Sequence, residues 1–142
     1  MRSNFIPHPT MRGEGRCRTC DFPFSKLIDA EVAQHAAVHK RYLALANSVG
    51  APVPEATREE WRRTGLALQF LPDVPFKERL AGAERWLLAE HHEHLCRALL
   101  YGVKRLDLRE YFTKCVEPSR LGNFQPDVAA ELRVRYSEGF IG

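Results

Sequence analysis

The chain has 142 residues, of which 44% are hydrophobic and 27% charged, a balance typical of a folded globular protein rather than a disordered or fibrous one. No stretch approaches the roughly 18 consecutive apolar residues of a membrane span, and Met1–Thr10 lacks the apolar core of a secretion signal, so an intracellular protein is expected. The formal charge of +3 is well below that of a dedicated DNA-binding protein.

The first fifty residues are predicted to hold an irregular arm and one helix. Residues 1–15 contain two prolines and two glycines without a periodic pattern, which predicts an irregular arm. A helix is expected from about Ala30 to Ser48, with Asp29 as its N-cap and Gly50 as its stop. Two prolines then mark a linker.

The next helices are predicted from a cap signal and from apolar spacing. Thr57 and Glu60 have the spacing of a capping box, which predicts a helix that ends before Pro72. After Pro75 the apolar residues recur at intervals of three, four and seven. This pattern predicts one long helix, or two helices joined near Gly82.

The C-terminal part of the chain is predicted to hold two further helical segments. Asp107 and Glu110 repeat the capping-box spacing, and Pro126 suits the first turn of a last helix that runs to about Ser137. The chain is therefore expected to be mainly α-helical, with little strand outside its first third.

Four potential metal ligands follow the arm, in the pattern Cys17-x2-Cys20-x14-His35-x3-His39. In a reducing compartment such cysteines are more often thiols or metal ligands than disulfides. The two-residue gap lets both sulfurs reach one ion, and histidines four residues apart share a helix face. We expect one structural zinc ion with no open position for a catalytic water. The alternative is that these are incidental thiols and ordinary helix residues.

Over about residues 15–42 this segment resembles the two-Cys, two-His zinc finger family. Phe24 and Val32 stand at the family's aromatic and aliphatic core positions. Gly15 stands where an aromatic residue is usual, and the inner spacing of fourteen residues exceeds the usual twelve or so. The resemblance implies a ββα unit. The predicted architecture is an arm (1–15), a zinc-finger-like module with an extended helix (16–50) and a bundle of about four helices (55–142).

In the DNA-reading members of that family, three positions near the start of the helix contact bases, and here they are Ile28, Glu31 and Gln34. Ile28 cannot donate two hydrogen bonds to guanine, and phosphates repel Glu31 unless it accepts a hydrogen bond from cytosine, so only Gln34 is a natural base reader. One finger also covers only about three base pairs. Sequence-specific recognition is therefore not expected.

Partner contacts are expected around the ligands instead. Met1–Ser48 contains seven Lys or Arg against four Asp or Glu, whereas the rest of the chain contains fourteen of each. These basic groups suit phosphates or an acidic protein surface, although a merely solvated face is the alternative. The predicted contact residues are Arg12, Arg16, Arg18, Gln34, Lys40 and Arg41.

The run Glu90-His91-His92-Glu93-His94 is a second place where a metal could bind, because His92 and Cys96 are one helical turn apart. A continuous run, however, spreads its side chains around the helix. His91 is expected to be half-buried, and His92 and His94 exposed.

No nucleophile elbow, phosphate-binding glycine loop or zinc-protease motif is present, so no catalytic residue is assigned. The favoured function is a zinc-stabilised, non-enzymatic regulator or adaptor that docks on a macromolecular partner, such as nucleic-acid or transcription machinery. A protein partner is favoured, and neither a membrane nor a small-molecule substrate is expected. The alternatives are direct, largely sequence-independent DNA or RNA binding, and a metal-dependent enzyme that uses the His91–His94 region.

Overall fold

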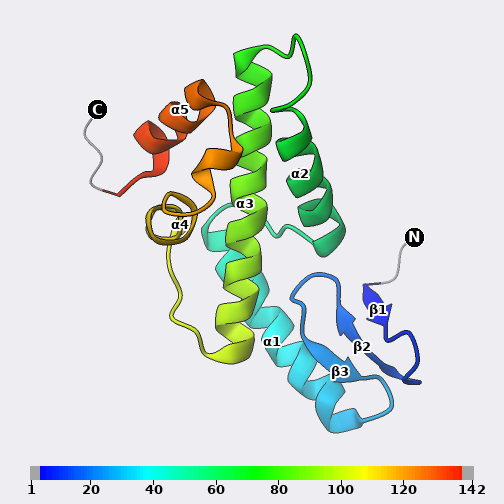
Figure 1. The fold of residues 1–142 in the computed structure, drawn as a ribbon. Coiled ribbons are helices and arrows are strands. Elements are labelled where there is room, and N and C mark those ends of the chain that lie inside the picture. Colours follow the sequence, from blue (N-terminus) through cyan, green and yellow to red (C-terminus); the bar gives the residue numbers. More distant parts are fainter. Residues whose placement is uncertain (1–3, 139–142) are drawn as a thin grey trace. The chain divides into compact units, whose positions relative to one another are not determined.

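The computed structural model describes residues 4–138, and their elements are shown in Figure 1. The chain divides into two compact units. Unit 1 includes the residues up to Ala56 together with His92–Lys104, and unit 2 includes Thr57–His91 and the residues from Arg105 onward. Residues 1–3 of the predicted arm and 139–142 of the predicted helical domain lie outside the described residues. The mainly helical class is confirmed.

Unit 1 begins with a three-stranded antiparallel sheet of order β1-β2-β3. The strands are β1 (Phe5–Pro7), β2 (Glu14–Cys17) and β3 (Pro23–Ser25). The prediction of an irregular arm was therefore wrong for β1 and for the start of β2. It failed because strands this short carry no periodic signal and become ordered only when their backbone groups pair with a neighbour.

Strand β1 also explains why a glycine stands at the position where the finger family has an aromatic residue. A Cβ atom at Gly15 would lie 2.3 Å from the Ile6 carbonyl oxygen and 2.5 Å from the Phe5 ring. The Phe5 ring packs edge-on against Phe24, with ring centroids 5.2 Å apart. An aromatic side chain from β1 thus occupies the space above Gly15.

Helix α1 (Asp29–Ser48) packs against β3, and the two lie next to each other in Figure 1. Asp29 is the first helical residue rather than the N-cap, and the N-cap residue Ile28 makes no side-chain cap bond. Val32 is 40% exposed, so this residue does not form the core contact that the finger pattern predicts. The core of unit 1 consists of Cys17, Cys20, Phe24, Tyr42, Ala46, Leu95 and Cys96.

Helix α3 (Phe76–Tyr101) is one continuous helix, and its first part belongs to unit 2. Helix α2 (Glu55–Ala67) begins two residues before the predicted Thr57 cap. A Cβ atom at Gly65 of α2 would lie 2.5 Å from the carbonyl oxygen of Gly82 of α3. Gly82 therefore permits close helix packing and does not divide the long helix.

The rest of unit 2 packs on the first part of α3. The predicted capping box at Asp107 and Glu110 is confirmed and starts α4 (Leu108–Tyr111), which continues into the π-helix η1 (Phe112–Val116). A short 3₁₀ turn, η2 (Leu121–Asn123), precedes α5 (Pro126–Tyr136), where Pro126 stands in the first turn as predicted. The core consists of Leu80, Ala83, Trp86, Leu87, Tyr111, Phe112, Val116, Leu121, Phe124, Val128 and Leu132. None of the described helices has the length and apolar character of a membrane span.

Candidate metal centre

The four predicted ligands meet in unit 1. Cys17 ends β2, Cys20 lies in the turn before β3, and His35 and His39 are one turn apart on α1. Their ligand atoms all lie within 4.8 Å of one another, and Cys17 Sγ is 3.4 Å from His39 Nδ1. A tetrahedral zinc site places sulfur and nitrogen ligands about 3.6 Å apart. The group can therefore hold one metal ion with four protein ligands.

The surroundings of His35 also fit a bound ion. Its Nε2 atom is buried and has no hydrogen-bond partner among the described residues. The imidazole stacks on the Phe24 ring with centroids 4.3 Å apart and an interplanar angle of 11°. A buried imidazole nitrogen without a partner is costly, and an ion bound through this nitrogen would remove that cost.

The side chains of Cys17 and Cys20 are hydrogen-bonded to each other, and this contact shifts the pKa of both. The hydrogen bond from the Cys20 thiol, together with amide bonds from Cys20 and Thr19, lowers the pKa of Cys17 to about 4, against the opposing effect of burial. The same thiol–thiolate contact and burial raise the pKa of Cys20. One sulfur of the pair thus already has thiolate character, which is the form that binds metal.

Three residues near the two cysteines were not identified from the sequence. The Thr19 amide donates to Cys17 Sγ at 3.3 Å, the Asn4 side-chain amide donates to the same sulfur at 3.4 Å, and the buried Cys96 thiol donates to the Thr19 carbonyl at 3.7 Å. The Thr19 contact is foreseeable from the Cys-x-x-Cys spacing, because the gap forces a tight turn. The other two depend on the strand register and on a distant helix.

The predicted partner-contact residues differ in their exposure and in the bonds that they make within the fold. The Arg16 guanidinium pairs with both carboxylate oxygens of Glu55, and Arg18 is held through its backbone, since its amide donates to the Asn4 carbonyl and its carbonyl accepts from the Glu55 amide. The exposed residues of the set are Arg12, Gln34, Lys40 and Arg41.

Of the three positions that contact bases in the DNA-reading fingers, one has a side chain that makes a hydrogen bond within this fold. Glu31 accepts a hydrogen bond from the Ser25 amide at 3.0 Å, which ties the start of α1 to β3. Ile28 is 45% exposed but remains apolar. Only Gln34 is both exposed and polar, as the sequence already indicated.

The histidine run of α3 does not gather ligands. His92 is 3% exposed, so the prediction that it is exposed was wrong, and its Nδ1 lies 3.1 Å from the Tyr42 hydroxyl. His91 is buried, more deeply than expected. Within the described part of the chain, no group of three or more potential ligands includes this run.

His91 is expected to make unit 2 sensitive to acid. Burial lowers the pKa of His91 below its ordinary value of 6.5, and this outweighs the raising effect of the Leu106 carbonyl, 2.9 Å from Nε2. His91 therefore binds a proton more readily in the unfolded chain than in the folded protein. As a result, neutral His91 favours the folded state above about pH 6.5, and this contribution to stability is lost as the pH falls below that value. NMR titration of the His91 ring should give a midpoint below 6.5.

A variant at His91 distinguishes the loss of stability caused by protonation of His91 from the loss caused by release of a bound metal ion in acid. His91→Gln keeps a donor for the Leu106 carbonyl but cannot titrate. We expect the variant to lose less stability than the wild type between pH 7 and pH 5, as measured by urea unfolding. Equal losses would contradict the assignment.

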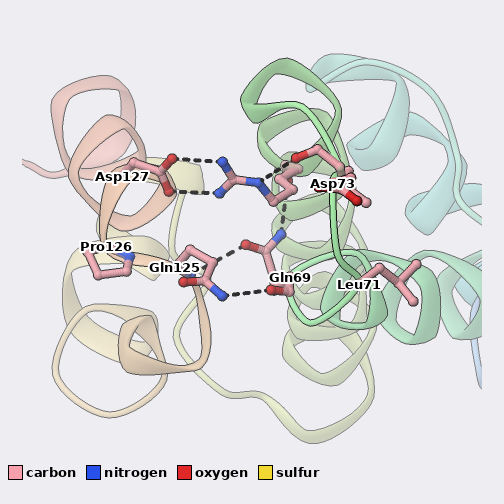
Figure 2. Close-up of a pocket in the computed structure, with 8 residues that line it drawn as sticks. Gln69, Leu71, Asp73, Gln125, Pro126 and Asp127 are labelled. Atoms are coloured by element: carbon pink, nitrogen blue, oxygen red, sulfur yellow. Dashed lines mark hydrogen bonds and ion pairs between the residues drawn. The ribbon is translucent and has the colours of Figure 1, made fainter.

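Unit 2 contains a separate groove of about 470 Å³ between the α2–α3 loop and the start of α5. Figure 2 shows that its polar side chains bond to one another and to backbone groups at the rim of the groove, as Gln125 does to Gln69. The Arg79 guanidinium donates two bonds of 2.8 Å to Asp127, and the Gln125 side-chain amide donates to the Gln69 carbonyl at 2.7 Å. The ion pair lowers the pKa of Asp127. These groups join the loop to α5 and do not form a convergent set of ligand-binding groups.

No protein-family model, curated protein or solved structure matches this chain.

Proposed function

We propose that the chain is a zinc-stabilised, non-enzymatic regulator or adaptor that docks on a macromolecular partner through unit 1. The observation that carries the proposal is the convergence of Cys17, Cys20, His35 and His39, whose four ligand atoms would fill every position of one tetrahedral ion. A closed site of this kind stabilises a fold and leaves no position for a reacting water.

Zinc is the ion that this donor set favours. Two thiolates and two imidazoles in a tetrahedral arrangement suit zinc better than calcium, magnesium or manganese, which prefer oxygen ligands. The Cys-x-x-Cys turn, the helical histidine pair and the aromatic residue Phe24 resemble the corresponding parts of a two-Cys, two-His finger. An intracellular setting would keep the thiols reduced and available to the ion.

The charge distribution supports docking through unit 1. This unit contains nine Lys or Arg and six Asp or Glu, whereas unit 2 contains twelve of each, so the whole excess of +3 lies in unit 1. A bound zinc ion with two thiolates leaves that excess unchanged. Unit 1 also exposes large apolar side chains, with Met11 56% and Leu27 70% accessible. Exposed apolar groups together with exposed cations are typical of a protein-docking surface.

Charge reversal tests the docking surface. In pull-downs from the native host, Arg12→Glu combined with Arg41→Glu should reduce the capture of a specific partner about tenfold, because both side chains are exposed and change sign. The matched control is Arg63→Glu combined with Lys77→Glu, two exposed residues of unit 2. Equal capture by both double variants would contradict docking through unit 1.

Direct nucleic-acid binding is the second candidate, because the basic excess is confined to one unit. Fluorescence anisotropy with a labelled 20-nucleotide duplex of arbitrary sequence distinguishes the two. Phosphate contacts predict binding that weakens steeply between 50 and 200 mM salt and is lost in the Arg12/Arg41 double variant. Absence of binding at low salt would leave the protein-docking proposal as the better explanation.

A further inference from the structure

The side chain of Asn4 lies beside one of the proposed metal ligands. Its Nδ2 donates to Cys17 Sγ at 3.4 Å, and its Oδ1 accepts from the Thr19 hydroxyl at 2.8 Å. Thr19 is buried and also donates its backbone amide to the same sulfur at 3.3 Å. Cys17 Sγ therefore receives hydrogen bonds both from main-chain amides and from the side-chain amide of Asn4.

The chemistry of these partners fixes the orientation of the Asn4 amide. A thiolate can only accept, so the amide nitrogen must face Cys17 and the oxygen must face Thr19. The Thr19 hydroxyl donates to that oxygen and holds the rotamer. The Asn4 carbonyl also accepts from the Arg18 amide at 2.8 Å, so the backbone of Asn4 is anchored to the same turn.

We propose that Asn4 is a positioning residue of the metal centre, which stabilises Cys17 as a thiolate ligand through its side-chain amide and is itself held by the Thr19 hydroxyl. This inference rests on the proposed zinc site. Hydrogen bonds to a metal-bound thiolate withdraw charge from the sulfur and offset its negative charge. Loss of such an outer partner typically weakens metal affinity about 10- to 100-fold.

The test replaces the donor without changing its size. Asn4→Asp exchanges the amide nitrogen for a carboxylate oxygen that repels the thiolate, and Asn47→Asp makes the same charge change at an exposed residue of α1. Competition with a chromophoric chelator should show zinc binding weakened 10- to 100-fold in Asn4→Asp, and within about twofold of the wild type in Asn47→Asp.

Cobalt substitution provides a readout that a purely structural role would not change. In the Co²⁺-loaded protein, loss of the N–H···S bond should shift the sulfur-to-metal charge-transfer band to longer wavelength in Asn4→Asp. The uncharged variant Asn4→Leu should shift it in the same direction. Thr19→Val, which removes the hydroxyl that holds the amide, should produce an intermediate shift.

The outcomes separate this inference from the zinc proposal. A wild-type chain that binds neither Zn²⁺ nor Co²⁺ would overturn both. A wild type that binds, with Asn4→Asp and Asn4→Leu unchanged in affinity and in band position, would overturn the role of Asn4 alone.

Discussion

Removal of the metal ion is expected to unfold unit 1. Binding of a structural zinc ion contributes on the order of 10 kcal/mol to folding in small zinc modules, which is as large as the whole stability of many domains. The core of unit 1 is small and includes two of the proposed ligands, Cys17 and Cys20. Without the ion, the buried imidazole nitrogen of His35 would again have no partner. Chelation should therefore raise amide hydrogen exchange throughout β1–β3 and α1.

A cysteine substitution tests the same expectation without a chelator. Cys17→Ser should abolish zinc binding in native mass spectrometry and reproduce the hydrogen-exchange pattern of the chelated protein. Cys115→Ser is the matched control, because Cys115 lies in η1 of unit 2 and is not one of the four ligands. That control should retain one zinc ion and the protection of the wild type. A metal-free wild type, or equal protection in all three proteins, would remove the zinc proposal.

The ligand group could be predicted because its geometry is local. The gap between Cys17 and Cys20 and the helical spacing of His35 and His39 each bring two donors together within a few residues. Only the distance between the cysteine pair and the histidine pair depends on the fold. Most helix positions were predictable for the same reason, since the N-cap Asp107 and the first-turn proline Pro126 each act on their own first turn.

The features that were not predicted depend on contacts between distant residues. Strand β1 exists because its backbone pairs with β2, and Phe5 fills the space above Gly15 only in that register. The burial of His92 requires Tyr42, which lies fifty residues earlier in the chain. Asn4 reaches Cys17 through the same hairpin. Sequence patterns predict helices and strands from neighbouring residues. They do not predict which residues from distant parts of the chain come into contact.

The substitution Phe112→Ala is expected to destabilise unit 2 by about 3–5 kcal/mol, the usual cost of removing a buried aromatic ring. Phe112 is fully buried at the start of η1 and is part of the unit 2 core. The π-helical turn cannot collapse into the space, because Val116 at its other end is also fully buried. Urea unfolding should show a lower midpoint. The exposed Phe70, 74% accessible, gives the matched control Phe70→Ala, with an effect within about 0.5 kcal/mol.

The zinc content of Phe112→Ala distinguishes destabilisation of unit 2 alone from destabilisation that also disrupts the proposed metal centre of unit 1. The four proposed metal ligands all belong to unit 1, and Phe112 belongs to unit 2. Below its melting temperature the variant should therefore still bind one zinc ion, and chelation should further destabilise it. A variant that loses zinc while its far-ultraviolet circular dichroism stays native would contradict the assignment of the metal centre to unit 1 alone. Retention of zinc would mean that metal binding depends on the sheet and α1, where all four ligands and the Asn4 contact lie.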